Sequence, residues 1–274
     1  MKIAIDAMGG DHAPEQIVAG ALEAAVAYPD TTLILVGDEA RLRALVKEWP
    51  ANVTLHHAGE VIESDDEPAK AVRRKKDASM VVAGRLVKEK QADAMISAGN
   101  TGALMATGLL VVGRLPGIER PAIASMIPTV DGAGFLALDL GANMDATPEQ
   151  LCQYAVMGSI YCRQVNGIER PRVGLLNVGT EAMKGNEAVK AAHGLIGRAP
   201  LNFVGNVESR DVMFGNCDVL VCDGFVGNVF LKTLEGTAAA IFSMLKAELA
   251  KDLSGKLAGA GLKPRLRQFK NKLD

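Results

Sequence analysis

The sequence predicts an α/β protein, a three-layer α/β/α fold in which helices cover both faces of a largely parallel sheet. Short apolar runs alternate with helical patterns along the chain, as is typical of parallel strands buried on both sides. Hydrophobic residues make up 49% of the 274 residues, enough for an extended core, and 29 glycines suit short connections. Because no repeat or low-complexity linker interrupts the pattern, we expect residues 1–274 to form a single domain.

The predicted strands are short runs of Ile, Leu, Val and Ala that end at glycine or a polar turn residue. In chain order they cover residues 2–6, 32–36, 53–56, 94–97, 121–127, 134–140, 173–177 and 219–222. The fifth and sixth runs are separated by a turn at Asp131 and Gly132, which favours a hairpin between them.

The predicted helices follow these strands and begin at capping residues or prolines. Asp38 and Thr147 are expected N-caps, and Pro148 occupies the first helical position, where proline is favoured. The expected helices cover residues 14–26, 38–47, 79–89, 101–112, 147–163, 185–196 and 225–250.

Charge and motif content exclude several classes of protein. With 30 basic and 32 acidic residues the net charge is −2, so nucleic-acid binding is not expected. Four cysteines and four histidines lack metal-ligand spacing, so no metal is expected. The N-terminus has no secretory pattern, which favours the cytoplasm. The uncharged stretch 94–113 contains too many polar residues and glycines to be a membrane span.

Five predicted strands end in loops that combine glycine with Asp, Asn or Thr. These loops read DAMGGDH from Asp6, SAGNTG from Ser97, DLGAN from Asp139, NVGTE from Asn177 and DGFVGN from Asp223. The carboxyl ends of parallel strands meet at one edge, so we expect the loops to face one crevice. There is no GxGxxG, Walker or nucleophile-elbow motif. Amides, backbone N–H groups and a lysine suit phosphate and an oxyanion rather than a covalent intermediate.

Lys184 and Asn228 are the side chains of these loops with the clearest chemical use. Lys184 comes just before the helix expected at 185–196, where a solvated surface lysine is an equally good interpretation. Asn228 has the alternative of a simple turn or capping amide. His12 could donate a hydrogen bond or act as an acid or base.

At these loops the sequence resembles the bacterial phosphate acyltransferase family. The resemblance rests on MKIAIDAMGGDHAP, PAKAVRRKKDASM, ADAMISAGNTGALMA, LDLGANMD, NVGTEAMKGNE and CDGFVGNV, in the same order over nearly the whole chain. It implies transfer of a long-chain acyl group from acyl-[acyl-carrier-protein] to inorganic phosphate, giving acyl phosphate for phospholipid synthesis. It further implies a homodimer, an isocitrate/isopropylmalate dehydrogenase-like fold and no cofactor. Members of the family continue with a glycine-rich segment, so a C-terminal segment is expected to be missing after Asp274.

The implied reaction needs no enzyme nucleophile, because phosphate is already an oxyanion and a thiol is a good leaving group. Catalysis then rests on positioning and on oxyanion stabilisation, which we assign to Lys184 and Asn228. The residues expected to bind phosphate, the pantetheine end or the rest of the substrate come from the same loops: Asp6, Gly9, Gly10, His12, Asn100, Thr101, Gly102, Asn143, Thr180, Asp223 and Gly224.

Two basic segments suggest partners. The run Arg73, Arg74, Lys75 and Lys76, with Lys70 nearby, is either a solvated helix face or a docking site for the acidic carrier protein. Residues 246–274 carry eight basic and three acidic side chains, a net +5, interleaved with leucines. This amphipathic helical segment predicts peripheral contact with the anionic inner face of the plasma membrane, or burial in a homodimer interface.

Three alternative functions stay open. A phosphate acetyltransferase-like enzyme would use acyl-coenzyme A with the same phosphate chemistry. A dehydrogenase would share the fold, but no carboxylate cluster for a metal-bound hydroxy acid is evident. A non-catalytic scaffold at the membrane surface would use only the basic tail.

Overall fold

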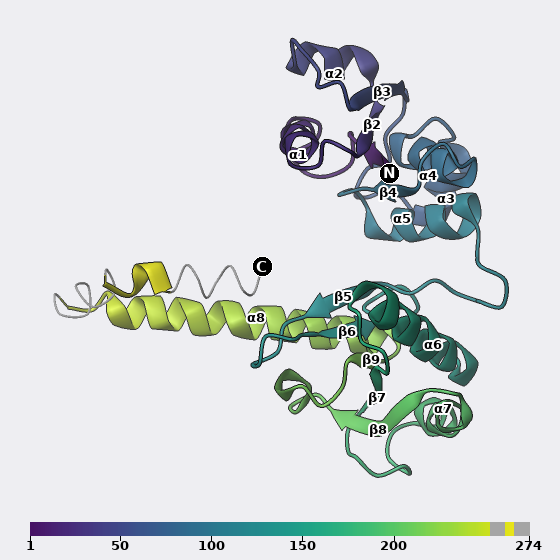
Figure 1. Cartoon of the computed structure of the whole chain (residues 1–274), viewed down its shortest axis with the longest axis vertical. Coiled ribbons are helices and arrows are strands. Elements are labelled where there is room, and N and C mark those ends of the chain that lie inside the picture. The colour runs from purple at the N-terminus through teal and green to yellow at the C-terminus, as the bar shows by residue number, and fades with distance from the viewer. Residues whose placement is uncertain (253–260, 266–274) are drawn as a thin grey trace. The chain divides into compact units, whose positions relative to one another are not determined.

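The computed structural model describes residues 1–252 and 261–265. The chain is divided into two compact units, Met1–Pro121 and Ala122–Asp274, each with a sheet and a core of its own (Figure 1).

Unit 1 is a four-stranded parallel sheet with the strand order β3-β2-β1-β4. Its strands are β1 (Lys2–Asp6), β2 (Thr32–Gly37), β3 (Val53–His57) and β4 (Ala94–Ile96). Its helices are α1 (Glu15–Ala27), α2 (Glu39–Leu45), α3 (Pro68–Arg74), α4 (Ser79–Lys88) and α5 (Thr101–Thr107), with a π-helical turn η1 at Gly108–Val112.

Alternating side chains of the central strands bury both faces of this sheet. On one face Ile5 and Leu35 pack with Val18 of α1, and on the other Ala4 and Val36 pack with α4. Unit 1 therefore has three layers, as the near-continuous apolar strands predicted. Asp38 caps α2 as expected, because its carboxylate accepts hydrogen bonds from the backbone N–H groups of Ala40 and Arg41.

Unit 2 is a five-stranded sheet with the order β5-β6-β9-β7-β8, in which only β5 is antiparallel. Its strands are β5 (Ala124–Ile127), β6 (Phe135–Leu138), β7 (Arg172–Asn177), β8 (Asn202–Glu208) and β9 (Val219–Val221). Its helices are α6 (Pro148–Val165), α7 (Glu187–Arg198), the 3-10 turn η2 (Val212–Phe214) and α8 (Gly224–Leu249).

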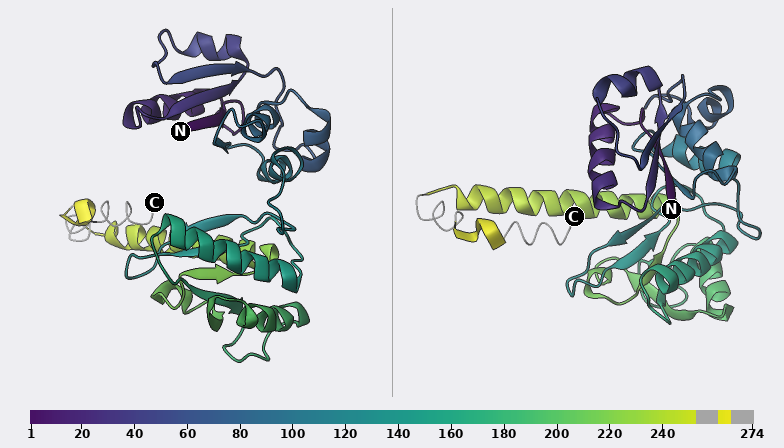
Figure 2. Two further views of the ribbon diagram at one scale, coloured as in Figure 1. Left: turned by 45° about the vertical axis from the view of Figure 1, so that its right-hand side comes forward. Right: turned by 45° about the horizontal axis from the view of Figure 1, so that its top comes forward.

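The helices of unit 2 also lie on both sides of their sheet. Leu151 and Tyr154 of α6 and Ile196 of α7 share one core with the strands, whereas Phe230 and Leu234 of α8 pack into the core on the other face. The second half of α8 continues well past the strands, as both views of Figure 2 show. Each unit is thus an α/β/α layer structure, and the predicted fold class is confirmed.

The structure differs from the sequence prediction in three places. Instead of one continuous sheet there are two sheets, one in each unit, and residues 113–123 between them contain no strand or helix. Gly113, Pro116, Gly117 and Pro121 explain this break, because prolines remove ladder donors and glycines favour turns. The prediction also missed α3 and β8.

Candidate active site

The carboxylate of Asp6 organises the strand ends of unit 1. Asp6 ends β1, is 1% exposed and accepts hydrogen bonds from Ser79 Oγ and Ser97 Oγ, both at 2.6 Å. Ser79 opens α4 and Ser97 follows β4, so one buried charge joins three segments. The side chain of Asp6 is therefore a support for the loops rather than a free ligand.

The two glycine loops of unit 1 approach each other as closely as backbones can. A Cβ on Gly9 would overlap the Asp6 carboxylate, and a Cβ on Gly99 would lie 3.3 Å from Gly9 Cα. Gly10 has φ +114°, which other residues rarely adopt. Gly9 and Gly10 therefore lie against the loop after β4, as the sequence predicted. His12 follows them in the chain and is exposed.

Asn100 holds the loop after β4 rather than offering a free amide. Its Oδ1 accepts a hydrogen bond from Ala103 N at 3.0 Å, which caps α5, and its Nδ2 donates to Ser64 O at 3.1 Å. Thr101 and Gly102 follow in the first turn of α5 and are exposed.

Asp139 plays the corresponding part in unit 2. It follows β6, has no exposed surface, and its carboxylate accepts hydrogen bonds from Ile123 N, Ala142 N and Asn143 N at 2.8–3.0 Å. The Asn143 side chain adds a donor at 2.9 Å. Asn143 was predicted to bind substrate, but its amide is bonded to the carboxylate that shapes its own loop.

The loop after β6 packs on the beginning of α8. Gly224 N donates to Asn143 O at 2.8 Å, and Asp223 caps the helix by accepting from Val226 N at 2.9 Å. A Cβ built on Gly141 would lie 3.7 Å from the side chain of Asn228. The predicted residues Asn143, Asp223, Gly224 and Asn228 therefore lie together, and Asn228 is the exposed one.

Lys184 lies in the loop between β7 and α7. Asn177 Nδ2 donates to Lys184 O at 3.0 Å, and Lys184 N donates to Glu181 O at 3.0 Å, so the backbone of this lysine is fixed at both ends. Its side chain is exposed and, within residues 1–252 and 261–265, its ammonium group takes part in no ion pair. Thr180 in the same loop is exposed as well.

A cavity of 690 Å³ opens at the carboxyl ends of β7 and β9. Asn186 and Asp223, the N-caps of α7 and α8, line it, and so does Gly185, which follows Lys184. Among the predicted site residues only Asp223 lines this cavity. Ser209 and Arg210 from the loop after β8 line it too, and sequence reasoning missed them because it missed that strand. The apolar residues within 202–208, followed by the polar residues Ser209 and Arg210, could have indicated this strand and its loop.

None of the four cysteines is poised as a thiolate. Burial raises the pKa of the Cys162 thiol to about 11 and that of Cys217 to about 12. Burial also raises the pKa of Cys152 and of Cys222, which donates to Asp139 O at 3.3 Å. Because the thiolate is the nucleophile, these groups are unreactive near neutral pH.

The predicted docking residues split into exposed and engaged side chains. Arg73 and Arg74 at the end of α3 are exposed, as is Lys76. Lys75 instead forms an ion pair with Asp66 at 2.5 Å and donates to Val61 O at 2.9 Å. The hydrogen bond from Lys75 lowers the pKa of Asp66.

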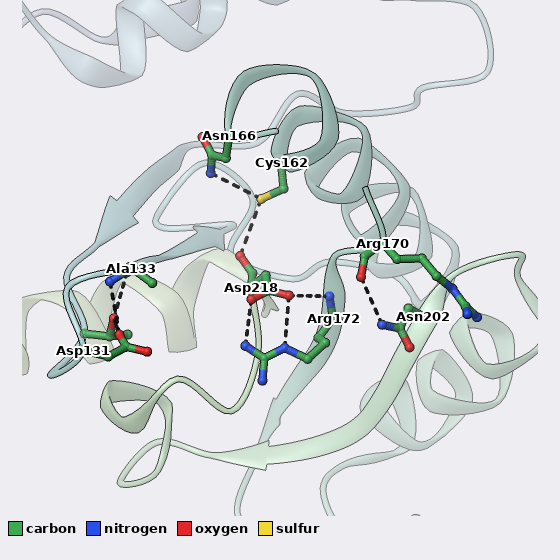
Figure 3. A network of polar contacts seen from close by, with 10 residues as sticks. Asp131, Ala133, Cys162, Asn166, Arg170, Arg172, Asn202 and Asp218 are labelled. Atoms are coloured by element: carbon green, nitrogen blue, oxygen red, sulfur yellow. Dashed lines mark hydrogen bonds and ion pairs between the residues drawn. The ribbon is translucent and has the colours of Figure 1, made fainter. Parts of the chain in front are cut away.

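A second polar network lies at the other end of the unit 2 strands (Figure 3). Arg172 begins β7, and its guanidinium and backbone N–H both donate to Asp218, the backbone bond being 2.7 Å long. Burial by itself would raise the pKa of Asp218, but the hydrogen bonds from Arg172 lower it below its ordinary value. Asn202 Nδ2 donates to Arg170 O at 3.1 Å and ties β8 to the same edge. This edge faces away from the strand ends that carry the cavity.

The strand-end loops thus gather at one sheet edge within each unit, two in unit 1 and three in unit 2. The expectation that all five face one crevice stays a prediction. In the described part of the chain no helix has the length and apolar character needed to cross a membrane. Nor do three His, Cys, Asp or Glu side chains gather as metal ligands among those residues.

Comparison with known proteins gives a family match along the whole chain. A model of the family described as "Fatty acid synthesis protein" matches residues 1–274. A "Phosphate acyltransferase" from Bacillus cereus (strain B4264) is 60% identical over 274 residues, which cover 100% of this chain and 83% of the relative. One from Brevibacillus brevis is 61% identical over 275 residues, covering 100% and 82%.

Solved structures of the same fold are more distant in sequence. The EutD phosphotransacetylase from Staphylococcus aureus has a TM-score of 0.62 at 18% identity, with 87% of this chain and 82% of that chain covered. A branched-chain phosphotransacylase from Enterococcus faecalis has a TM-score of 0.56 at 20% identity, with 86% and 84% covered. At such identities the likeness supports the fold. The family match and the 60% identity show more: the chain belongs to the phosphate acyltransferase family and is an acyltransferase.

Proposed function

We propose that this protein transfers a long-chain fatty acyl group from acyl-[acyl-carrier-protein] to inorganic phosphate. In the proposed reaction a phosphate oxygen forms a bond to the thioester carbonyl carbon, and the C–S bond breaks. The carrier-protein thiolate leaves and takes a proton from water, and acyl phosphate is released for phospholipid synthesis. The family match supports the phosphate acyltransferase chemistry.

Direct attack by phosphate is supported by the side chains at the strand ends. All four cysteine thiols have a raised pKa, so none is a ready nucleophile near pH 7. Phosphate carries its own negative charge, and the leaving thiol needs little acid assistance because its pKa is about 8.5. The protein then has to position two reactants and stabilise the tetrahedral oxyanion.

The observation that carries the proposal is that Lys184 and Asn228 are exposed in loops where four other predicted polar side chains are already bonded. Asp6, Asn100, Asn143 and Asp223 are engaged within the protein, whereas Lys184 and Asn228 are exposed. We assign Lys184 to the phosphate and oxyanion charge and Asn228 to the thioester carbonyl. Gly9, Gly10, Gly102 and Gly224 stay proposed substrate contacts, and the exposed His12, Thr101 and Thr180 would supply further donors.

The experiment is an assay of acyl hydroxamate formed from palmitoyl-carrier protein, phosphate and hydroxylamine. Lys184→Ala and Asn228→Ala are each expected to lower kcat by about 10²–10³, the usual cost of one oxyanion donor. Lys190→Ala is the matched control, because Lys190 lies on the same segment in an exposed pair with Glu187 at 2.9 Å. Turnover without phosphate, or an acylated protein side chain, would contradict direct attack.

We further propose that Arg73, Arg74 and Lys76 dock the acidic carrier protein. Lys75 supports the segment through Asp66 instead of contacting the partner. Because opposite charge steers association, Arg73→Glu with Arg74→Glu should raise the KM for acyl-carrier protein severalfold and leave the KM for phosphate unchanged. Arg41→Glu, an exposed arginine of α2, is the control. An unchanged KM for the carrier-bound substrate would reject the docking site.

The basic segment 246–274 is proposed to touch an anionic membrane at the cytoplasmic face. Residues 253–260 and 266–274 of this segment lie outside the described residues, and within the rest Leu262 is 46% exposed. The alternative is that the leucines of this segment are buried in the interface of a homodimer. Flotation with anionic but not neutral vesicles supports the membrane, and a salt-insensitive dimer that never floats supports the interface.

A phosphotransacetylase-like activity on coenzyme A thioesters is the second candidate function. It is favoured by one observation, the fold shared with two phosphotransacylases. The same assay with palmitoyl-coenzyme A in place of the carrier substrate decides between the two donors. Hydroxamate formation that requires both this protein and phosphate, from either donor, would also reject a non-catalytic membrane scaffold.

A further inference from the structure

The 690 Å³ cavity of unit 2 is lined mainly by apolar side chains and has one polar end. Its volume lies in the range of about 300–1,000 Å³ that is usual for small-molecule sites. At the strand ends it is bounded by Asn177, Asn186 and Asp223. Leu175, Leu176 and Val189 of the sheet and α7 continue the wall inward. Such a cavity suits a molecule with a polar head and an apolar tail.

The long wall of the cavity is a stripe along α8. It consists of Val226, Val229, Phe230, Thr233, Leu234 and Thr237, a set that recurs every three to four residues and hence lies on one side of the helix. Val226 and Val229 are 41% and 52% exposed, and both threonines are exposed, so this wall is open to solvent. Eleven residues separate the first from the last, which at about 1.5 Å per residue is a length of about 16 Å. An extended alkyl chain advances about 1.3 Å per carbon, given C–C bonds of about 1.5 Å. The length of the stripe therefore matches that of an extended alkyl chain of about 12 carbons.

The polar end of the cavity adjoins Lys184. Asn177, which lines the cavity, donates to Lys184 O, and Gly185 lines the cavity directly after it. A chain that lies along α8 would accordingly begin near this lysine and end near Thr237.

We propose that this cavity holds the acyl chain of the substrate, with the thioester end at Asn177 and the methyl end toward Thr237. The inference rests on the proposed acyl transfer and names the chain-length determinant of the same site. Its expected optimum is a chain of about 12–16 carbons, since the polar end accommodates the first few carbons beyond the stripe.

Shortening the cavity tests this assignment. Thr233→Phe places a ring about 6 Å before the end of the stripe, which is the space of four or five methylenes. Each fully buried methylene is worth about fourfold in affinity, or about 0.8 kcal/mol, so a 16-carbon chain should bind at most about 10²–10³-fold more weakly. An 8-carbon chain should be unaffected. Ile241→Phe is the control on the same helix, because Ile241 is 59% exposed and lies outside the cavity.

Two readouts separate this inference from the proposed function. The first is kcat/KM for 8-carbon and 16-carbon acyl-carrier proteins, and the second is binding of palmitate to the protein without phosphate or carrier protein. If acyl phosphate forms but Thr233→Phe leaves both the chain-length ratio and palmitate binding unchanged, the cavity assignment is wrong and the function stands. If no donor gives acyl phosphate, the function fails while palmitate binding still decides the cavity.

A milder variant covers the case in which Thr233→Phe does not fold. Thr233→Val keeps the side-chain shape and replaces a hydroxyl by a methyl group at the stripe. Palmitate should then bind severalfold more tightly, because the chain no longer displaces water from the hydroxyl. Equal or weaker binding by this folded variant would overturn the assignment.

Discussion

At the scale of single residues, buried aspartates determine the shape of the loops in both units. Asp6 ends β1 and Asp139 directly follows β6; both are at most 1% exposed, and each accepts a hydrogen bond from the loop that follows it. A buried carboxylate is tolerated only when hydrogen-bond donors surround it. The two carboxylates therefore need the N–H donors of their loops, and the loops need the carboxylates as acceptors.

Replacement of Asp139 should therefore be costly even though the change is nearly isosteric. In Asp139→Asn an NH₂ group would face N–H donors at Ala142 or Asn143, leaving buried donors without acceptors. We expect a loss of about 2–4 kcal/mol in the free energy of unfolding, measured by urea denaturation. Asp145→Asn, an exposed position in the same loop, should change stability by less than about 0.5 kcal/mol.

Asp218 predicts a pH dependence of stability. Hydrogen bonds from Arg172 lower its folded-state pKa below the ordinary value of 3.8, so its contribution is complete above that value. The contribution disappears as the pH falls through the folded-state pKa. Wild type should exceed Asp218→Asn in melting temperature at pH 6, and the difference should shrink below pH 4. A difference that stays constant from pH 6 to pH 3 would show that the charge of Asp218 is not the cause.

The sequence predicted which positions are special but not what each side chain does. Asn100, Asn143 and Asp223 cap helices or bond to Asp139, and the contacts with substrate expected of them stay predictions. An amide or carboxylate beside glycine is favoured equally by a ligand and by an unpaired backbone N–H, and only coordinates reveal the partner. Lys184 and Asn228 keep their assigned roles as predictions.

At the scale of elements, the sequence predicted most strands and helices within a few residues. Strand β1 and the N-caps Asp38 and Thr147 appear as expected. Helix α3 was missed because it has only seven residues, and its stability comes from packing of Ala71 and Val72 rather than from propensity. Strand β8 was missed because Asn and Gly interrupt its apolar pattern, and Gly205 has φ +92° beside a register shift.

Two glycines of α8 should respond oppositely to alanine. At Gly227 a Cβ would overlap Asp139 O and lie 2.8 Å from Cys222 Sγ, so Gly227→Ala must displace the helix from the sheet. At Gly236 a Cβ meets nothing within 4 Å, so Gly236→Ala should stabilise the protein by about 0.5–1 kcal/mol.

Thermal melting of both variants tests this pair. Gly227→Ala should lose more than about 1 kcal/mol, since overpacking against backbone is not relieved by a side-chain rotation. Equal melting temperatures for the two variants would mean that α8 does not pack on the loop after β6 as described.

At the scale of the whole molecule, each of the two units has hydrophobic core clusters of its own. Leu35 is buried among residues of unit 1 and Leu175 among residues of unit 2. The sequence predicted the layer architecture because apolar strands need helices on both faces. It did not predict the division, although the Gly- and Pro-containing residues 113–121 carried the signal for a boundary.

Because each unit has core clusters of its own, a core substitution in one unit should lower hydrogen-exchange protection in that unit alone. Leu175→Ala should cost about 2–5 kcal/mol and reduce hydrogen-exchange protection in residues 122–252, with residues 1–121 unchanged. Leu35→Ala should produce the reverse pattern. Loss of protection across both units in either variant would show that they unfold as one cooperative body.

The length of α8 affects the stability of its distal helical turns. Its first turns lie against the strands, but nearly every side chain from Glu235 to Glu248 is exposed. Helical turns whose side chains are mostly exposed depend largely on local propensity and on local ion pairs such as Lys232–Glu235, and such stability is marginal in water for segments under about 12–15 residues. By itself the distal half would exchange rapidly between helix and coil, with fraying that travels inward and stops near Leu234, where the sheet begins to anchor the helix.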